Sequence, residues 1–404
     1  MLPKPNSEAP YQGSAERIPI QPRDKLFWVF VLSSCIYFVQ GIEGLPAQGL
    51  FYYMKETLHF SPEKIMVLNS LIIAAWIIKP VIGYIIDNFL RKSAWIFIAL
   101  GLDMALILIL GTWGLPIVIL VAILIINSTN AAFRDVAVDG IMCVEGKRYN
   151  ATGKIQSVQW ISISVSGLIT GIGGGYVAQY WGYKMGFLCL MPFYIITAIA
   201  TYCYKKSNSE EKNPSQNTLF ADLKKLFVNQ RLLILCLFIF LYKYSPSFGT
   251  PLFFIQRDVF KWGKIWIGAL GTIGTVFQIC GAVLYYKCSQ KINLKRWLYI
   301  SVFLGAATSM SYLYYTPVTA IVYDVIYGFL GMFIYVMILD FMARNTLKGL
   351  ETTSFALLCS VSNLALITSD LSGAFLLPKI GLHWLIIISS VTSFLCLPLI
   401  KKIE

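Results

Sequence analysis

Charged residues are scarce in this sequence of 404 residues: 13% are charged, whereas 57% are hydrophobic. A soluble domain carries about a quarter charged residues, because its surface has to be solvated. The lower share leaves too little polar surface to cover a water-soluble globule, and the mean hydropathy of +0.67 agrees with this. The composition therefore excludes an ordinary soluble protein and predicts an exterior that faces lipid.

The sequence also lacks the spacings of a metal site, a disulfide framework or an enzyme. His59 and His383 stand at the ends of apolar runs, without a metal-ligand spacing. The nine cysteines include no CxxC motif, and most lie within apolar runs, where free thiols act as small hydrophobes. Because no nucleophile is arranged with a base, we expect no enzyme, no metal and no cofactor.

Apolar runs of spanning length are abundant, and a membrane-crossing helix needs about 20 mostly apolar residues. Such runs occur near 26–52, 63–86, 94–113, 115–142, 153–180, 185–204, 231–255, 264–287, 296–315, 317–343, 351–377 and 381–400. A hydrophilic segment, 205–217, separates the first six from the last six. We therefore predict an all-α integral membrane protein with about twelve transmembrane helices in two six-helix bundles, which is the major facilitator fold.

The predicted organisation has five parts: a cytoplasmic tail at 1–25, a bundle at 26–204, a linker at 205–230, a bundle at 231–400 and a tail at 401–404. The first tail has no separate short apolar segment with a cleavage site, so we expect the first span to act as the insertion signal. Within the linker, apolar and charged residues interleave over 219–227. This pattern fits either a short amphipathic helix on the cytoplasmic face or an ordinary loop.

The net charge of +13 is distributed unevenly, because basic residues gather between every second pair of apolar runs. They are Arg91, Lys92, Lys147, Arg148, Lys154, Lys205, Lys206, Lys212, Lys224, Lys225, Lys287, Lys291, Lys295, Arg296, Lys401 and Lys402. This alternation follows the positive-inside rule and predicts that both termini are cytoplasmic. Because the alternation accounts for the excess of basic residues, we expect no nucleic-acid partner. We also expect a monomer in the plasma (cell inner) membrane.

Ionisable residues inside the apolar runs are the main functional signal, since each is costly in lipid unless it is paired or lines a wet cavity. They are Glu43, Lys79, Asp103, Arg134, Asp135, Asp139, Lys243, Asp324, Asp340 and Asp370. Asp103 and Asp370 have no evident partner in the sequence. Asp340 and Arg344, four residues apart near a span end, are expected to form an exposed helical pair.

The fourth apolar run holds the densest charge. Asp135 and Asp139 are four residues apart and share a helix face. Two carboxylates there repel in a low dielectric, so we expect one to take up a proton unless a cation, Lys79 or Arg134, lies between them. Such a carboxylate would let a proton-coupled carrier sense both proton and substrate. The alternative is a fixed charge lock between helices, made of Arg134, Asp135 and Lys79.

Three further interior charges are candidate binding residues. Lys79 precedes Pro80, which loosens the helix, so its side chain is expected to point into a cavity or else to snorkel to the surface. Glu43 lies in QGIEGLPAQG, where glycines and Pro46 interrupt the span; this indicates either a cavity or a packing kink. Asp324 lies deeper in its run, close to two tyrosines.

The segment GYIIDNFLRK after the second run is a degenerate form of the loop motif of major facilitators. Gly83 permits close helix approach, while Asp87 with Arg91 and Lys92 can latch one conformation. We therefore predict a gating role for these four residues. After the eighth run, Tyr285 stands where the acid would be, so the second copy of the motif is eroded.

Several segments resemble the folate–biopterin transporters of the major facilitator superfamily. They are 37–65, WIIKP at 76–80, RDVAVD at 134–139, GKIQSVQW at 153–160, YSPSFGTPLFF at 244–254, NLKRWL at 293–298 and GLETTSFALLCSVSN at 349–363. Muropeptide permeases and acetyl-CoA transporters are the nearest rival, since they share a GLP turn and a D-x-x-x-D motif. The 349–363 segment and the WxxKP element favour the folate–biopterin group.

The resemblance implies a carrier that imports folate or a related pteridine by alternating access, commonly by proton symport. A carboxylate can accept two hydrogen bonds from a pterin edge, and the flat ring suits stacking on Trp76 or Trp160. The glutamate tail of a folate needs a cation, which Lys79, Arg134 or Lys243 can supply. The expected partners are this small molecule, protons and the lipid bilayer. Alternatives are a carrier for another anionic metabolite, such as a muropeptide or nucleotide-like cofactor, and a non-transporting receptor.

Overall fold

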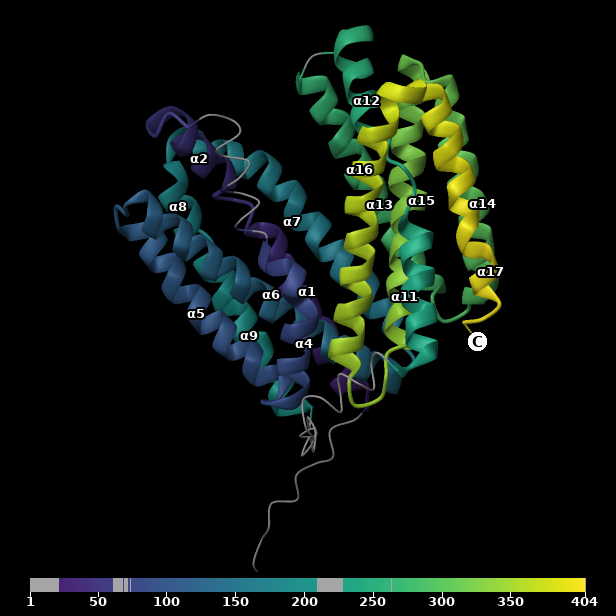
Figure 1. The fold of residues 1–404 in the computed structure, drawn as a ribbon. Helices are drawn as coiled ribbons and strands as arrows, with labels where there is room; N and C mark the ends of the chain where they lie inside the picture. Colours follow the sequence, from purple (N-terminus) through teal and green to yellow (C-terminus); the bar gives the residue numbers. More distant parts are fainter. Residues whose placement is uncertain are drawn as a thin grey trace, which may run out of the picture.

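The computed structural model of the chain describes residues 22–60, 68, 72, 74–208, 228–262 and 264–403, and its regular elements there are all helical. The first group (purple to teal in Figure 1) comprises α1 (Pro22–Ile42), α2 (Ala47–Tyr52), α4 (Lys79–Asn88), α5 (Lys92–Thr112), α6 (Ile117–Arg148), α7 (Thr152–Tyr180), α8 (Gly182–Leu188) and α9 (Met191–Ser207). The second group (green to yellow) comprises α11 (Gln230–Lys243), α12 (Gly249–Phe254), α13 (Lys264–Cys288), α14 (Leu294–Ser311), α15 (Pro317–Arg344), α16 (Glu351–Thr392) and α17 (Leu397–Ile400).

Eight stretches of the described residues are long and apolar enough to cross a bilayer. Their outer faces carry large apolar side chains that a water-soluble protein would bury: Val118 is 76% exposed and Phe375 62% exposed. Such a surface is stable only against lipid. The predicted all-α membrane architecture is therefore confirmed for the described residues.

Several helices begin at residues that satisfy free backbone N–H groups. The side chains of Asn229 and Asn293 accept hydrogen bonds from backbone N–H groups at the starts of α11 and α14, and Thr316 forms a capping box with Thr319 at α15. Each such cap contributes about 1 kcal/mol. The helix α16 bends at Gly381, where the second of the spans predicted at 351–377 and 381–400 begins. Gly381 has a φ of 74°, a backbone conformation that glycine adopts at little cost.

The spans predicted at 26–52 and 231–255 are each broken in two, in the same way. The helix α1 ends at Ile42, and α2 begins after a break of four residues, 43–46, and runs into a π-helical turn at Tyr53–Thr57. In the second group, α11 ends at Lys243, and α12 runs into a π-helical turn at Ile255–Val259. Gly44 and Pro46 in the first break and Pro246 in the second explain why a continuous helix does not form.

The two groups meet at one end and diverge toward the other (Figure 1). At the end where they meet, which we call the contact end, α4 and α6 pack against α16, and α7 packs against α13 and α15. The opposite end, which carries α2 and α12, is called the splayed end. The predicted linker begins later than expected, because α9 continues to Ser207. The candidate amphipathic helix at 219–227 lies outside the described residues.

Candidate functional site

A buried ion pair joins α4 to α6 between the predicted second and fourth spans. Lys79 Nζ donates a hydrogen bond of 2.7 Å to Asp135 Oδ2, and both side chains are almost wholly buried. Lys79 begins α4 directly after a 3₁₀ turn at Ala74–Ile78, and its Nζ lies 4.4 Å from the ring centroid of Trp76. Lys79 therefore points into the protein and does not snorkel.

Asp139 lies one turn beyond Asp135 on α6 and has different partners. Its Oδ1 accepts hydrogen bonds from the Tyr37 hydroxyl of α1 at 2.8 Å and from Gln159 Nε2 of α7 at 3.4 Å. Its Oδ2 has no hydrogen-bond partner among the described residues. The predicted carboxylate pair is thus present with one cation, Lys79, which binds Asp135 alone and leaves Asp139 to neutral donors.

Arg134 is not the cation of that pair, because it faces the inside of the first bundle. Its guanidinium binds Asp103 of α5 and Glu43 at the end of α1. The Tyr194 hydroxyl of α9 also donates to Glu43, and Asn130 Nδ2 donates to Asp103 at 2.7 Å. The expectation that Asp103 lacks a partner is wrong. The missed signal was the spacing of Asn130 and Arg134, which places both on one face of α6.

The two broken spans place an ionisable residue at each break. Glu43 follows the last residue of α1, and Lys243 is the last residue of α11. At the second break, the Ser245 N–H donates to Ser369 Oγ and the Ser247 N–H to the Ser369 carbonyl, both at 3.0 Å. Irregular backbone at membrane depth is stable only with such internal partners or beside a wet cavity.

A cavity of about 470 Å³ lies next to Lys243 in the second bundle. Its wall is polar and aromatic and includes Trp160, Tyr242, Ser245, Gln278, Thr308 and Tyr335. Lys243 Nζ lies 4.5 Å from the Tyr335 ring centroid, and within the described residues it has no carboxylate partner. Among the described residues, the side chains that line this cavity include no acid. The cavity is therefore a pocket of ligand-binding size with one unneutralised cation.

A chain of rings connects this cavity to Asp139. Tyr335 meets Trp160 edge to face at 4.7 Å, and Trp160 meets Tyr37, which binds Asp139, at 6.4 Å. Within the described part of the molecule the buried Nε1 of Trp160 has no hydrogen-bond partner. The structure thus brings Asp139, Trp160 and Lys243 around one region between the bundles, with Lys79 and Trp76 on its first-bundle side.

Not every predicted site residue lies there. Trp76 donates its Nε1 hydrogen to Ser128 Oγ at 3.2 Å and covers Lys79. Asp324 is only half-buried on α15, does not line the 470 Å³ cavity and forms no hydrogen bond with a described side chain. Glu43 and Arg134 belong to the separate cluster inside the first bundle.

The predicted gating residues lie at the contact end. Asp87 Oδ2 accepts hydrogen bonds from the backbone N–H and the hydroxyl of Thr353 at 2.8 and 2.7 Å, and its Oδ1 lies 3.5 Å from Lys92 Nζ. A Cβ on Gly83 would lie 2.9 Å from the Thr353 Cα, so only glycine allows this approach of α4 to α16. Arg91 is exposed beside a surface hollow that Lys92 also lines.

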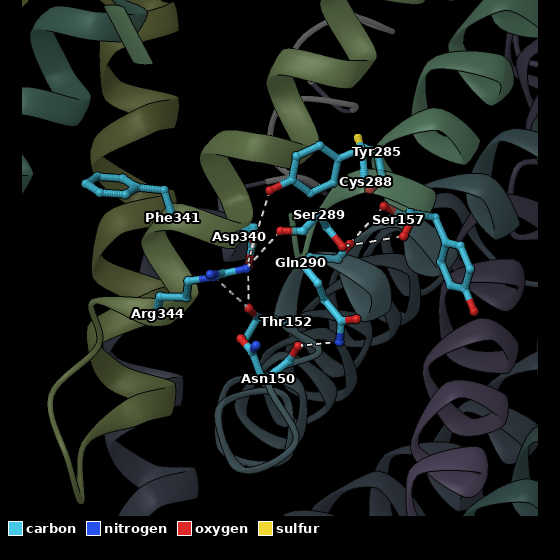
Figure 2. A network of polar contacts seen from close by, with 12 residues as sticks. Asn150, Thr152, Ser157, Tyr285, Cys288, Ser289, Gln290, Asp340, Phe341 and Arg344 are labelled. Atoms are coloured by element: carbon cyan, nitrogen blue, oxygen red, sulfur yellow. Dashed lines mark hydrogen bonds and ion pairs between the residues drawn. The ribbon is translucent and has the colours of Figure 1, made fainter. Parts of the chain in front are cut away.

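A second network joins the bundles at this end (Figure 2). Asp340 is fully buried; it accepts hydrogen bonds from Arg344, from the Thr152 hydroxyl of α7 and from the Tyr285 hydroxyl of α13, the last at 2.7 Å. The expectation of an exposed Asp340–Arg344 pair is wrong, because α7 and α13 cover it. Tyr285, at the eroded motif position, supplies a donor to Asp340.

Comparisons with known proteins agree with this architecture. The model of the BT1 family matches residues 40–403. A folate-biopterin transporter of Synechocystis sp. is 26% identical over 398 residues, covering 92% of this chain and 81% of that protein. Folate transporter 1 of Plasmodium falciparum is 23% identical over 361 residues, covering 84% and 71% of the two chains.

Solved structures match over nearly the whole length. The human organic anion transporter MFSD10 superposes with a TM-score of 0.67 at 14% identity, covering 94% of this chain and 99% of that one. The fucose:proton symporter FucP of E. coli superposes with a TM-score of 0.68 at 13% identity, covering 93% and 98%. The predicted major facilitator fold is confirmed.

Proposed function

This chain belongs to the BT1 family, and we propose that it imports folate or a related pteridine together with protons by alternating access. It is a membrane transporter with the major facilitator fold, and the resemblance to folate–biopterin transporters noted in the sequence is confirmed by its relatives. The names of those relatives refer to folate and biopterin, which supports a pteridine as the cargo here.

The observation that carries this proposal is the unneutralised Lys243 beside the cavity of about 470 Å³. Sequence alone offered three cations for the anionic tail of a folate. Lys79 is neutralised by Asp135, and Arg134 by Asp103 and Glu43, so an anion would meet Lys243 without displacing an internal partner. A cation in this position, with no acid among the described residues of the cavity wall, favours a ligand that carries a negative charge.

The pterin ring of such a ligand can bind Asp139 and Trp160. Asp139 Oδ2 is free to accept hydrogen bonds from the adjacent N–H and NH₂ donors of a pterin edge. The Trp160 ring, between Tyr37 and Tyr335, offers a face or an edge to a flat heterocycle, and its unpartnered Nε1 offers a hydrogen bond. A single flat molecule with donors at one end and a carboxylate at the other would use all three groups.

Alternating access requires that the contacts between bundles at one end can break. At the contact end these include the Asp87–Thr353 hydrogen bonds between α4 and α16, the Asp340–Thr152 hydrogen bond between α15 and α7, and the Lys147–Thr346 hydrogen bond between α6 and the segment after α15. Polar contacts of this kind can exchange with water during a transport cycle. We propose that this end faces the cytoplasm of a plasma membrane and that the carrier acts as a monomer.

Ligand-dependent stabilisation of the purified protein tests the cargo. A ligand at 100 times its dissociation constant stabilises a protein by about 2.7 kcal/mol, which raises its melting temperature measurably. We expect folate and biopterin to do so, and a muropeptide or a nucleotide-like cofactor to have no effect. Stabilisation by one of the latter two alone would replace the pteridine with another anionic metabolite.

A further inference from the structure

A second charged cluster lies inside the first bundle, away from the proposed pteridine site. It contains two carboxylates, Glu43 and Asp103, and one guanidinium, Arg134, whose side chain is 1% exposed. With both carboxylates ionised, the cluster carries one net negative charge. An uncompensated charge at membrane depth costs several kcal/mol, and binding one proton removes it.

Asp103 has a hydrogen-bond donor on each of its carboxylate oxygens. Its Oδ1 accepts from Asn130 at 2.7 Å, its Oδ2 accepts from Arg134, and its side chain is completely buried. Both oxygens are therefore already occupied as hydrogen-bond acceptors. A proton on Asp103 would have to displace one of these donors.

Glu43 has the opposite environment. Its Oε1 accepts from Arg134 and from the Tyr194 hydroxyl, whereas its Oε2 makes no hydrogen bond with any described residue. The Glu43 side chain is 18% exposed and stands at the break between α1 and α2. A hydrogen on Oε2 would therefore displace no existing donor, and Glu43 is the more exposed of the two carboxylates.

The surroundings add no second cation. From α5 the cluster receives Asp103, from α6 Arg134 and Asn130, and from α9 Tyr194. From α7 the Ser166 hydroxyl and the Ile163 carbonyl lie beside Gly41, and the Thr170 side chain lies beside Gly44; none of these groups is a cation. Within the part of the chain that the structure describes, Arg134 is thus the one cation that pairs with Glu43.

We propose that Glu43 Oε2 carries the proton that this carrier couples to substrate movement, at a site separate from Lys79, Asp135 and Asp139. Binding converts the carboxylate to a neutral carboxylic acid and leaves the Arg134–Asp103 ion pair intact, so the cluster becomes neutral. Release transfers the O–H proton to water and restores the negative charge. This inference rests on the proposed symport and names its proton site, which leaves Asp139 Oδ2 for the cargo.

Difference infrared spectroscopy of the purified protein in lipid detects the carbonyl stretch of a protonated carboxyl group without any substrate. We expect a titrating band in the wild type that is absent from Glu43→Gln and retained in Asp139→Asn. A Glu43→Asp variant, which keeps a carboxyl group, should show the band at a shifted pH. A band that survives in Glu43→Gln and disappears in Asp139→Asn would place the proton on Asp139 and overturn the proposal.

Transport by proteoliposomes gives the second readout. With labelled folate, Glu43→Gln should lose accumulation driven by an inward proton gradient, while exchange of labelled for unlabelled folate continues, because Gln mimics the protonated acid. Gradient-driven accumulation in Glu43→Gln equal to that of the wild type would overturn the proposal. If the wild type does not transport folate at all, the cargo is wrong, and the infrared band still decides the proton site.

Discussion

The Asp87 carboxylate at the end of α4 accepts hydrogen bonds from both the backbone N–H and the hydroxyl of Thr353, near the start of α16. The first N–H groups of a helix have no partner within that helix, so one of them is satisfied here from the opposite bundle. The close approach at Gly83 makes this geometry possible. The latch expected from the sequence thus has a defined partner, which the sequence did not reveal.

Replacing Asp87 with alanine should weaken the contact end. Hydrogen bonds to a charged group contribute about 1.5–3 kcal/mol each, so we expect local opening to increase about tenfold or more. Amide hydrogen exchange at Thr353 measures this local opening directly, because the Thr353 N–H is one of the donors to Asp87. The control is Glu351→Ala on the same helix turn: Glu351 accepts from the Gly349 N–H and, within the described residues, makes no hydrogen bond to α4. Unchanged exchange in Asp87→Ala would show that Asp87 does not hold the bundles together.

Removing one partner of the Lys79–Asp135 pair should destabilise the protein strongly. An unpaired buried charge remains, at a cost of about 3–5 kcal/mol. We expect Lys79→Met and Asp135→Leu each to lower the melting temperature in detergent, and the double variant to recover most of the loss because no charge is left behind. Additive losses in the double variant would mean that the two residues act independently.

Lys243 should discriminate anionic from neutral pteridines. In Lys243→Gln we expect the KM for folate to rise about tenfold or more, since a hydrogen-bonded charge pair contributes about 1.5–3 kcal/mol. Uptake of biopterin, which has no carboxylate, should change little. The matched control is Lys379→Gln, because Lys379 contacts Phe375 and does not line the cavity. An equal loss for both substrates would assign Lys243 a structural role.

The basic residues at the contact end predict the orientation of the protein in the membrane. Arg91, Lys92, Lys147, Arg148 and Lys348 all line one surface hollow there. In a variant without native cysteines, Lys348→Cys should react with a membrane-impermeant maleimide only after the cells are permeabilised. Tyr314→Cys, at the splayed end, should react in intact cells. The reverse pattern would place the termini outside and contradict the positive-inside interpretation.

Helical periodicity predicted part of the site correctly. Lys79 and Asp135 lie together as expected, and Asp139 shares their side of α6, because four residues advance a helix by about one turn. Arg134 directly precedes Asp135, but neighbouring residues on a helix point about 100° apart. It therefore faces α5 and α9, and a single sequence does not say which helices occupy that side.

Long-range packing explains the other differences. Asp340 looks like an exposed residue at a helix end, yet Thr152 and Tyr285 cover it from helices that lie far away in the sequence. The Pro and Gly residues near 43–46 correctly marked an interrupted span. The matching break after Lys243 was missed, because the serines at 245 and 247 are stabilised by Ser369, which only the folded second bundle brings there.

The most direct test of the account is uptake of labelled folate by proteoliposomes that contain the purified protein, with and without an inward proton gradient. We predict that folate accumulates above the external concentration only with the gradient, and that Asp139→Asn abolishes this uptake. Absence of uptake of either folate or biopterin by a correctly folded protein would contradict the central claim that this chain carries pteridines.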